Sequence, residues 1–116
     1  MSRQNIKITP NKGRVTVTFD GKIIASSTAA LDLDESGAPL RVYIPRADVD
    51  AAVLADSGTH SHCPYKGDAS YHSLKSAGAE AKDAVWYYPD PCPLVEPIRD
   101  YLAFWGNQIR YGMQPA

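Results

Sequence analysis

The chain has 116 residues and a mass of 12.6 kDa, with 44% hydrophobic and 22% charged residues, which predicts one globular domain over 1–116 with its core at about 14–106. Twelve basic and thirteen acidic residues leave a formal charge of −1. No basic run is present, so nucleic acid and membrane surfaces are excluded as expected partners. Two cysteines and no apolar leader predict a cytoplasmic protein with free thiols.

The first clear element is a hairpin over residues 14–26. Apolar and polar residues alternate along RVTVTF, which indicates a half-buried strand. Asp20-Gly21 then supplies the positive φ angles of a type I′ turn. A two-residue loop predicts that Val17 faces Ile24 across the hairpin.

Further strands are expected from alternation and from β-branched and aromatic residues. Residues 31–39, LDLDESGAP, are typical of a surface turn, and 46–54 of a connection with room for one helical turn. The expected strands lie at 40–44, 67–74 and 84–88.

The pattern changes after Pro93. Val95, Ile98, Leu102 and Trp105 follow a helical spacing, and Gly106 can end the helix. We therefore expect an amphipathic helix from about Leu94 to Trp105. The predicted fold class is mainly β (α+β), a compact antiparallel sheet or small barrel or sandwich with one C-terminal amphipathic helix.

The three histidines all lie in the stretch HSHCPYKGDASYHS. On a strand His60 and His62 point to one face and could ligate a metal if His72 joined them. A two-residue loop at Lys66-Gly67 places His72 on the far side, whereas a three-residue loop with Gly67 in the bulge places it opposite His60. The sequence leaves this parity open, so no cofactor is predicted and a three-histidine metal site is an alternative.

Cys63 and Lys66 are the candidate catalytic residues of the same stretch. A Cys63 thiolate could act as a nucleophile, although its neighbour His62 points the opposite way on a strand. Turn chemistry explains Gly67 and Asp68 but does not require Lys66, whose ammonium could hold an anionic group.

Aromatic residues cluster in the second half of the chain. Most are expected in the core. On their strand Trp86 and Tyr88 share one face and Val85 and Tyr87 the other, and one of these two faces could line a pocket whose mouth is the loop at 89–93.

Several separated motifs resemble one known family. They are Cys63-Pro64-Tyr65-Lys66-Gly67 followed by Ala69 and Tyr71, then Trp86, Tyr88-Pro89-Asp90-Pro91, Pro97-Ile98 and Tyr101-Leu102-Ala103-Phe104. Together they resemble the bacterial domain-of-unknown-function 427 family from about Val15 to Trp105. The resemblance implies a compact, mainly β domain, for which the label nucleotidyltransferase-like has been used.

A shared site of this family would draw on the motif residues. The expected ligand-binding residues are Tyr65, Lys66, Gly67, Tyr71, Trp86, Tyr88 and Asp90, with Cys63 and Lys66 as the catalytic candidates. We expect a domain that binds a small anionic or polar ligand, and whether it is an enzyme is left open. The alternatives are a noncatalytic interaction module or homodimer, and a metal-dependent enzyme using His60, His62 and His72.

Overall fold

The structure is a computed structural model that describes residues 5–115. Within this range the chain forms ten β-strands and three short 3₁₀ helices. The strands are β1 (Ile6–Pro10), β2 (Gly13–Phe19), β3 (Lys22–Ser27), β4 (Leu31–Glu35), β5 (Arg41–Tyr43), β6 (Leu54–Cys63), β7 (Gly67–Lys75), β8 (Glu80–Tyr87), β9 (Ala103–Phe104) and β10 (Ile109–Pro115). The helices are η1 (Arg46–Asp48), η2 (Ala51–Val53) and η3 (Pro93–Ile98).

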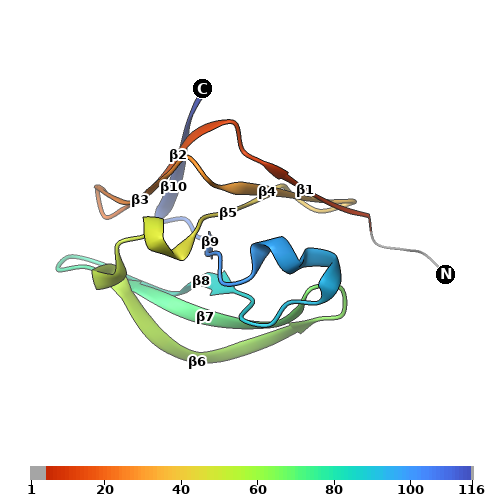
Figure 1. Ribbon diagram of the computed structural model, residues 1–116. Helices are drawn as coiled ribbons and strands as arrows, with labels where there is room; N and C mark the ends of the chain where they lie inside the picture. The colour runs from red at the N-terminus through yellow and green to blue at the C-terminus, as the bar shows by residue number, and fades with distance from the viewer. Residues whose placement is uncertain (1–4, 116) are drawn as a thin grey trace.

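The strands form three antiparallel sheets in two layers. Their orders are β1-β4-β5, β10-β2-β3 and β6-β7-β8-β9. The four-stranded sheet is the lower layer of Figure 1, and the two three-stranded sheets lie above it. Ile44, after β5, and Leu102, before β9, exchange two backbone hydrogen bonds of 2.8 Å and so join the layers. The mainly β, antiparallel class predicted from the sequence is confirmed.

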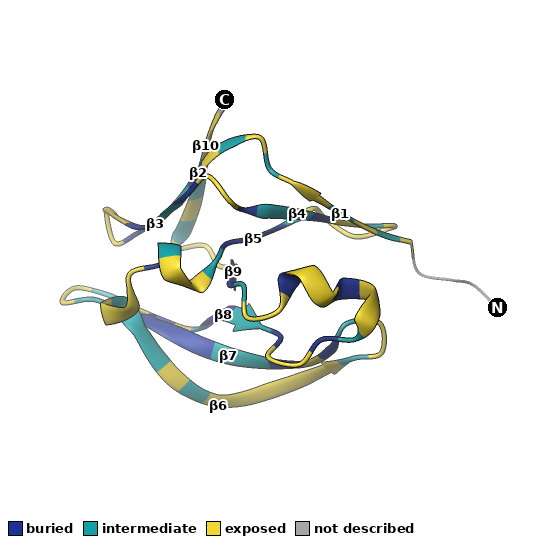
Figure 2. Ribbon diagram, in the orientation of Figure 1, coloured by how far each residue is buried: buried dark blue, intermediate teal, exposed yellow. Residues whose placement is uncertain are grey.

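Strand β5 runs between two hydrophobic cores. Val42 and Ile44 belong to the larger core, which β2, β3, β7 and β8 share, whereas Tyr43 belongs to a smaller core with Leu33 and Ile98. Figure 2 shows buried residues along β7, in the middle of the lower sheet, while most of β6 is exposed. Both faces of β5 are therefore covered, as is usual for a strand inside a layered fold.

The hairpin at 14–26 forms as predicted, with one difference in register. Asp20 and Gly21 have φ angles of 53° and 73°, as a type I′ turn requires. A β-bulge follows, and Val17 pairs with Ala25 instead of Ile24. The predicted Val17–Ile24 pair is therefore wrong, because the bulge lets two consecutive apolar residues, Ile24 and Ala25, both be buried.

Strands β1, β4 and β10 lie where no strand was predicted, and so does β9, which falls within the predicted helix. Residues 31–35 of the expected surface turn form β4, whose Leu33 is fully buried. Strands β1 and β10 lie outside the expected core of 14–106. They form edge strands of two sheets by pairing with β4 and β2. Such pairings join segments far apart in the sequence, which local alternation does not reveal.

The predicted helix at 94–105 is wrong. Only η3 forms, and its Val95 already has non-helical angles (φ −123°, ψ 27°). Pro93 and Pro97 limit the backbone donors that a longer helix needs, and Asp100 adopts a positive φ of 59°. The spacing of buried residues was real, because Val95, Ile98 and Leu102 are all fully buried. None of the helices within residues 5–115 is long and apolar enough to cross a membrane.

The burial of this segment can be tested with two leucines. Leu102 is 0% exposed and Leu94 is 52% exposed. We expect Leu102→Ala to lower the free energy of unfolding by about 2–5 kcal/mol, because it leaves a cavity in the core. Leu94→Ala should change it by less than about 0.5 kcal/mol. Urea denaturation measures both, and equal losses would contradict the packing described.

Candidate functional site

Four of the predicted ligand-binding residues line one open pocket. The pocket has a volume of about 350 Å³ and lies where the upper sheet at β5 meets β7 and β8 of the lower sheet. Its lining joins the predicted residues to three others that the sequence did not single out. The lining residues are Arg41, Lys66, Tyr71, Asp83, Trp86, Tyr88 and Trp105.

Arg41 is the pocket's unpaired cation. Its guanidinium carbon lies 5.5 Å from the centre of the Trp86 ring and 4.7 Å from that of Trp105. Among residues 5–115 the Arg41 guanidinium makes no salt bridge and donates no hydrogen bond. A guanidinium held over two indole faces keeps its planar set of donors available to a carboxylate or phosphate.

Lys66 is committed to a carboxylate of the protein. Its Nζ lies 2.7 Å from Oε1 of Glu35, at the end of β4, and the two side chains are 13% and 16% exposed. The two charges therefore compensate each other in a largely dry environment. The predicted free ammonium at this position is thus part of an internal ion pair.

The inner wall of the pocket, called the aromatic wall below, consists of Tyr71, Trp86 and Tyr88. The Trp86 indole N–H donates a 3.1 Å hydrogen bond to the Tyr43 hydroxyl, and the two rings meet edge to face. Burial raises the pKa of Tyr43 to about 12 and also raises the pKa of Tyr88. Tyr71 shares a 2.9 Å hydrogen bond with the Ser61 hydroxyl. The phenols of Tyr43 and Tyr88 are therefore neutral hydrogen-bonding groups at physiological pH.

Asp83 is the one carboxylate on the pocket's lining. It accepts hydrogen bonds from the hydroxyls of Ser57 and Thr59, and these bonds lower its pKa. Both carboxylate oxygens are thus engaged by β6, and no salt bridge with Arg41 forms.

Cys63 and Tyr65 do not line the pocket. Cys63 ends β6 and is half-buried, and its thiol is close enough to Tyr43 and Tyr88 to contribute to raising their pKa values. Tyr65 lies at the hairpin tip and is 40% exposed. Of the two, only Cys63 adjoins the aromatic wall.

Gly67 and Asp90 have structural surroundings. Gly67 has a φ of 112°, and a Cβ there would lie 3.3 Å from the carbonyl oxygen of Asp90 and 3.4 Å from the Cys92 nitrogen. Glycine is thus needed where the hairpin crosses the loop after β8. The Asp90 carboxylate is exposed and lies 3.4 Å from Arg99. Both residues shape the loop at the site and neither lines the pocket.

The histidines do not converge. Cys63 pairs with Gly67, so the loop is Pro64-Tyr65-Lys66 and both predicted loop alternatives are wrong. His60 and His62 are exposed and bond to Ser70 and Asp68, across the hairpin. Among residues 5–115, no group of three or more His, Cys, Asp and Glu side chains is placed to hold a metal ion.

His72 is separated from the other two histidines by burial. It is 8% exposed and stacks on the Tyr87 ring at 4.8 Å, and its Nε2 lies 3.1 Å from Nη1 of Arg46. Burial and the adjacent Arg46 charge lower the pKa of His72. It therefore packs as a neutral imidazole under η1.

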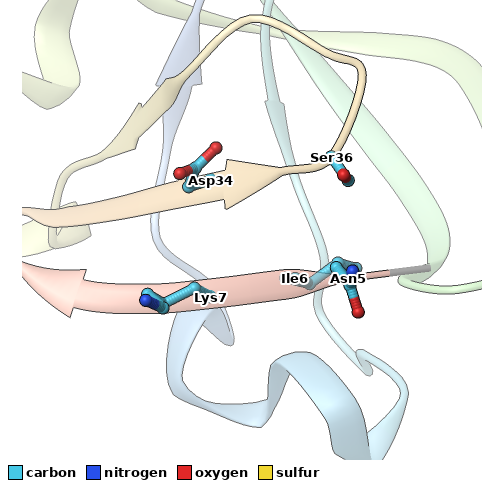
Figure 3. A pocket seen from close by; sticks show the side chains of 5 residues that line it. All are labelled: Asn5, Ile6, Lys7, Asp34 and Ser36. Carbon is cyan, nitrogen blue, oxygen red and sulfur yellow. The ribbon is translucent and has the colours of Figure 1, made fainter.

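Two further hollows lack this convergence. Figure 3 shows one beside β1 and β4, lined by Asn5, Ile6, Lys7, Asp34 and Ser36, with a volume of about 390 Å³. Lys7 and Asp34 are register partners on neighbouring strands. The other follows the polar β6 bulge near Ser57 and holds about 480 Å³. Neither contains an aromatic side chain or a predicted site residue.

The sequence reasoning missed Glu35, Arg41, Tyr43 and Trp105. Glu35 ends the alternation LDLDE, which could have indicated a strand. Arg41 and Tyr43 lie on one face of β5, but the sequence does not show what that face meets. Trp105 was assigned to the core, whereas it is 64% exposed.

The Lys66–Glu35 pair predicts a specific stability pattern. Lys66→Met leaves a buried carboxylate without its cation and should cost about 3 kcal/mol of unfolding free energy at pH 7. Adding Glu35→Gln should recover most of that loss. As a control, Lys75→Met removes a partner 3.9 Å from Glu80 in an exposed pair and should cost less than about 0.5 kcal/mol. Urea denaturation would contradict the burial of the pair if Lys66→Met and Lys75→Met cost the same.

The buried tyrosines predict a loss of stability in alkali. Burial raises the pKa of both Tyr43 and Tyr111 to about 12. Because these values exceed the ordinary value of 10.0, the associated stability is complete below pH 10 and is lost as pH rises towards 12. Tyr43→Phe should make the decline of unfolding free energy shallower by on the order of 1.4 kcal/mol per pH unit. Parallel curves for wild type and variant would refute this.

Comparisons with known proteins agree with the motifs around this pocket. A sequence profile of a domain of unknown function, DUF427, matches residues 7–114. No curated protein matches the chain. The match spans β2 to β9 and contains every residue of the pocket. The chain therefore belongs to the DUF427 family.

Proposed function

We propose that this domain binds a small anionic ligand in the pocket formed by Arg41, Lys66, Tyr71, Trp86 and Tyr88. The observation that carries the proposal is the Arg41 guanidinium, which lies over two indole rings at a pocket and has no carboxylate partner among residues 5–115. Unpaired arginines with aromatic support are suited to binding planar anions.

Arg41 is better placed than Lys66 to bind the anion. Glu35 already neutralises the Lys66 ammonium at 2.7 Å, so an incoming anion would have to displace a buried carboxylate. The sequence-based role of Lys66 as the anion-binding group is therefore reassigned in this proposal. The Lys66–Glu35 ion pair instead joins the hairpin to β4 of the upper sheet.

The aromatic wall suits the remainder of the ligand. Trp86, Tyr71 and Tyr88 offer ring surfaces, and the Tyr88 hydroxyl has no hydrogen-bond partner within residues 5–115. It is a neutral group, since burial raises its pKa, and can donate to a ligand oxygen. A volume of about 350 Å³ falls within the usual range of small-molecule sites.

Other sequence-based predictions stay predictions. Catalytic roles for Cys63 and Lys66 are among them, and each histidine makes contacts elsewhere that leave Cys63 without an imidazole base. We also propose a cytoplasmic location, which the two free thiols of Cys63 and Cys92 support.

The binding proposal can be tested by tryptophan fluorescence. The chain has two tryptophans, Trp86 and Trp105, and both line the pocket, so the signal reports on this site. Benzoate, inorganic phosphate, nucleotides and sugar phosphates would be titrated, with thermal shift as a second readout. We expect saturable binding of at least one anion, and an affinity lower by about tenfold or more in Arg41→Gln, because a charge-assisted bond is lost.

The matched control is Arg110→Gln, on β10. Arg110 is exposed and lies outside the pocket, so its loss should leave anion affinity unchanged. Equal weakening in Arg41→Gln and Arg110→Gln would indicate bulk electrostatics. Absence of any saturable anion response in wild type would refute the proposed function.

A further inference from the structure

A second hollow adjoins the anion pocket and is mainly apolar. It holds about 210 Å³ and is lined by Leu40, Val42, Ala103, Phe104, Tyr111 and Met113 together with Arg41 and Trp105. Arg41 and Trp105 thus line both hollows. We call this second hollow the apolar groove. A molecule bound to Arg41 can extend into either hollow.

The groove concentrates exposed apolar side chains. Leu40, Trp105 and Met113 are 53%, 64% and 52% exposed, and they come from three different segments. The other large exposed hydrophobic residues among 5–115, Ile23, Tyr65 and Leu94, lie outside both hollows. Exposed apolar side chains that gather around a concavity usually mark a binding surface.

We propose that the ligand is an amphipathic anion, an alkyl carboxylate whose head group binds Arg41 and whose hydrocarbon chain lies in the apolar groove. This inference rests on the proposed function and adds the class of ligand. The unpaired guanidinium at the junction supplies charge complementarity to the head group. The side chains of Leu40, Val42 and Met113 cover the hydrocarbon chain of the ligand.

The size of the groove favours an alkyl chain over a protein partner. A volume of about 210 Å³ admits one chain or ring but not a helix. Stable homodimers bury roughly 800 Å² per partner, which three partly exposed side chains do not supply. A free alkyl carboxylate also differs from a lipid in a membrane, because the carboxylate comes from water and must transfer its whole hydrocarbon chain from water into the groove.

The test is a homologous series. Acetate, butanoate, hexanoate and octanoate would be titrated into the wild-type chain and followed by tryptophan fluorescence, with hexan-1-ol as the uncharged match for hexanoate. We expect affinity to rise two- to fourfold per added methylene, as burial of each CH₂ predicts. Hexan-1-ol should bind at least tenfold more weakly than hexanoate.

Two groove variants separate the tail from the head group. Leu40→Ser and Met113→Ser should reduce the gain per methylene to less than twofold while leaving the affinity for inorganic phosphate unchanged. The control is Ile23→Ser, which removes an exposed hydrophobic residue (64%) away from both hollows and should leave the whole series unaltered. All three positions are exposed, so folding should be preserved.

The outcomes distinguish this inference from the proposed function. Anion binding through Arg41 without chain-length dependence would overturn the amphipathic ligand and leave the anion site standing. Absence of binding by every anion would overturn both. A wild-type dimer on size-exclusion chromatography that Met113→Ser dissociates would assign the groove to a second copy. Cosedimentation with phosphatidylglycerol vesicles without binding of octanoate would assign it to a lipid surface, and each result would refute the inference.

Discussion

The arrangement depends on the register of β5, whose two faces enter different environments. Val42 and Ile44 point into the larger core, while on the other face Tyr43 enters the smaller core and Arg41 lines the pocket. The paired hydrogen bonds of Ile44 with Leu102 hold this register against the lower layer. A slip of one residue would exchange the faces and bury a guanidinium in hydrocarbon, which is far too costly to be populated. One short strand thus sets both the packing and the chemistry of the site.

The two cations of the pocket, Lys66 and Arg41, have different partners, and the chemistry of the pocket follows from that difference. Lys66 pairs with Glu35 in a partly buried ion pair, which joins the hairpin to the upper sheet. The Arg41 guanidinium instead donates no hydrogen bond within residues 5–115 and lies over the rings of Trp86 and Trp105. Stacking holds an arginine in place without satisfying its donors. Aromatic rings therefore hold Arg41 in place, and its guanidinium, whose donors remain free, supplies the positive charge of the site.

Local patterns predicted much of the β-structure and part of the pocket. Alternation located the first hairpin, because a half-buried strand imprints its period directly on the sequence, and β-branched and aromatic residues located the strands carrying Tyr71 and Trp86. Family motifs brought Lys66 and Tyr88 into the same proposed site. Arg41 and Glu35 were missed because their roles arise from contacts between sheets that no local pattern encodes. The apolar spacing after Pro93 was mistaken for a helix, since a proline-rich coil can bury residues at the same intervals.

The pairing of β10 with β2 joins segments far apart in the sequence, since Pro115 lies opposite Gly13. Tyr111 and Met113 of β10 complete the apolar groove, so the groove cannot exist while β2 has β3 as its sole neighbour. During synthesis on the ribosome, β2 must wait with one edge unpaired until β10 emerges. The groove is consequently complete only after β10 has paired with β2, and a chain interrupted before Ile109 would present an open strand edge, which favours self-association.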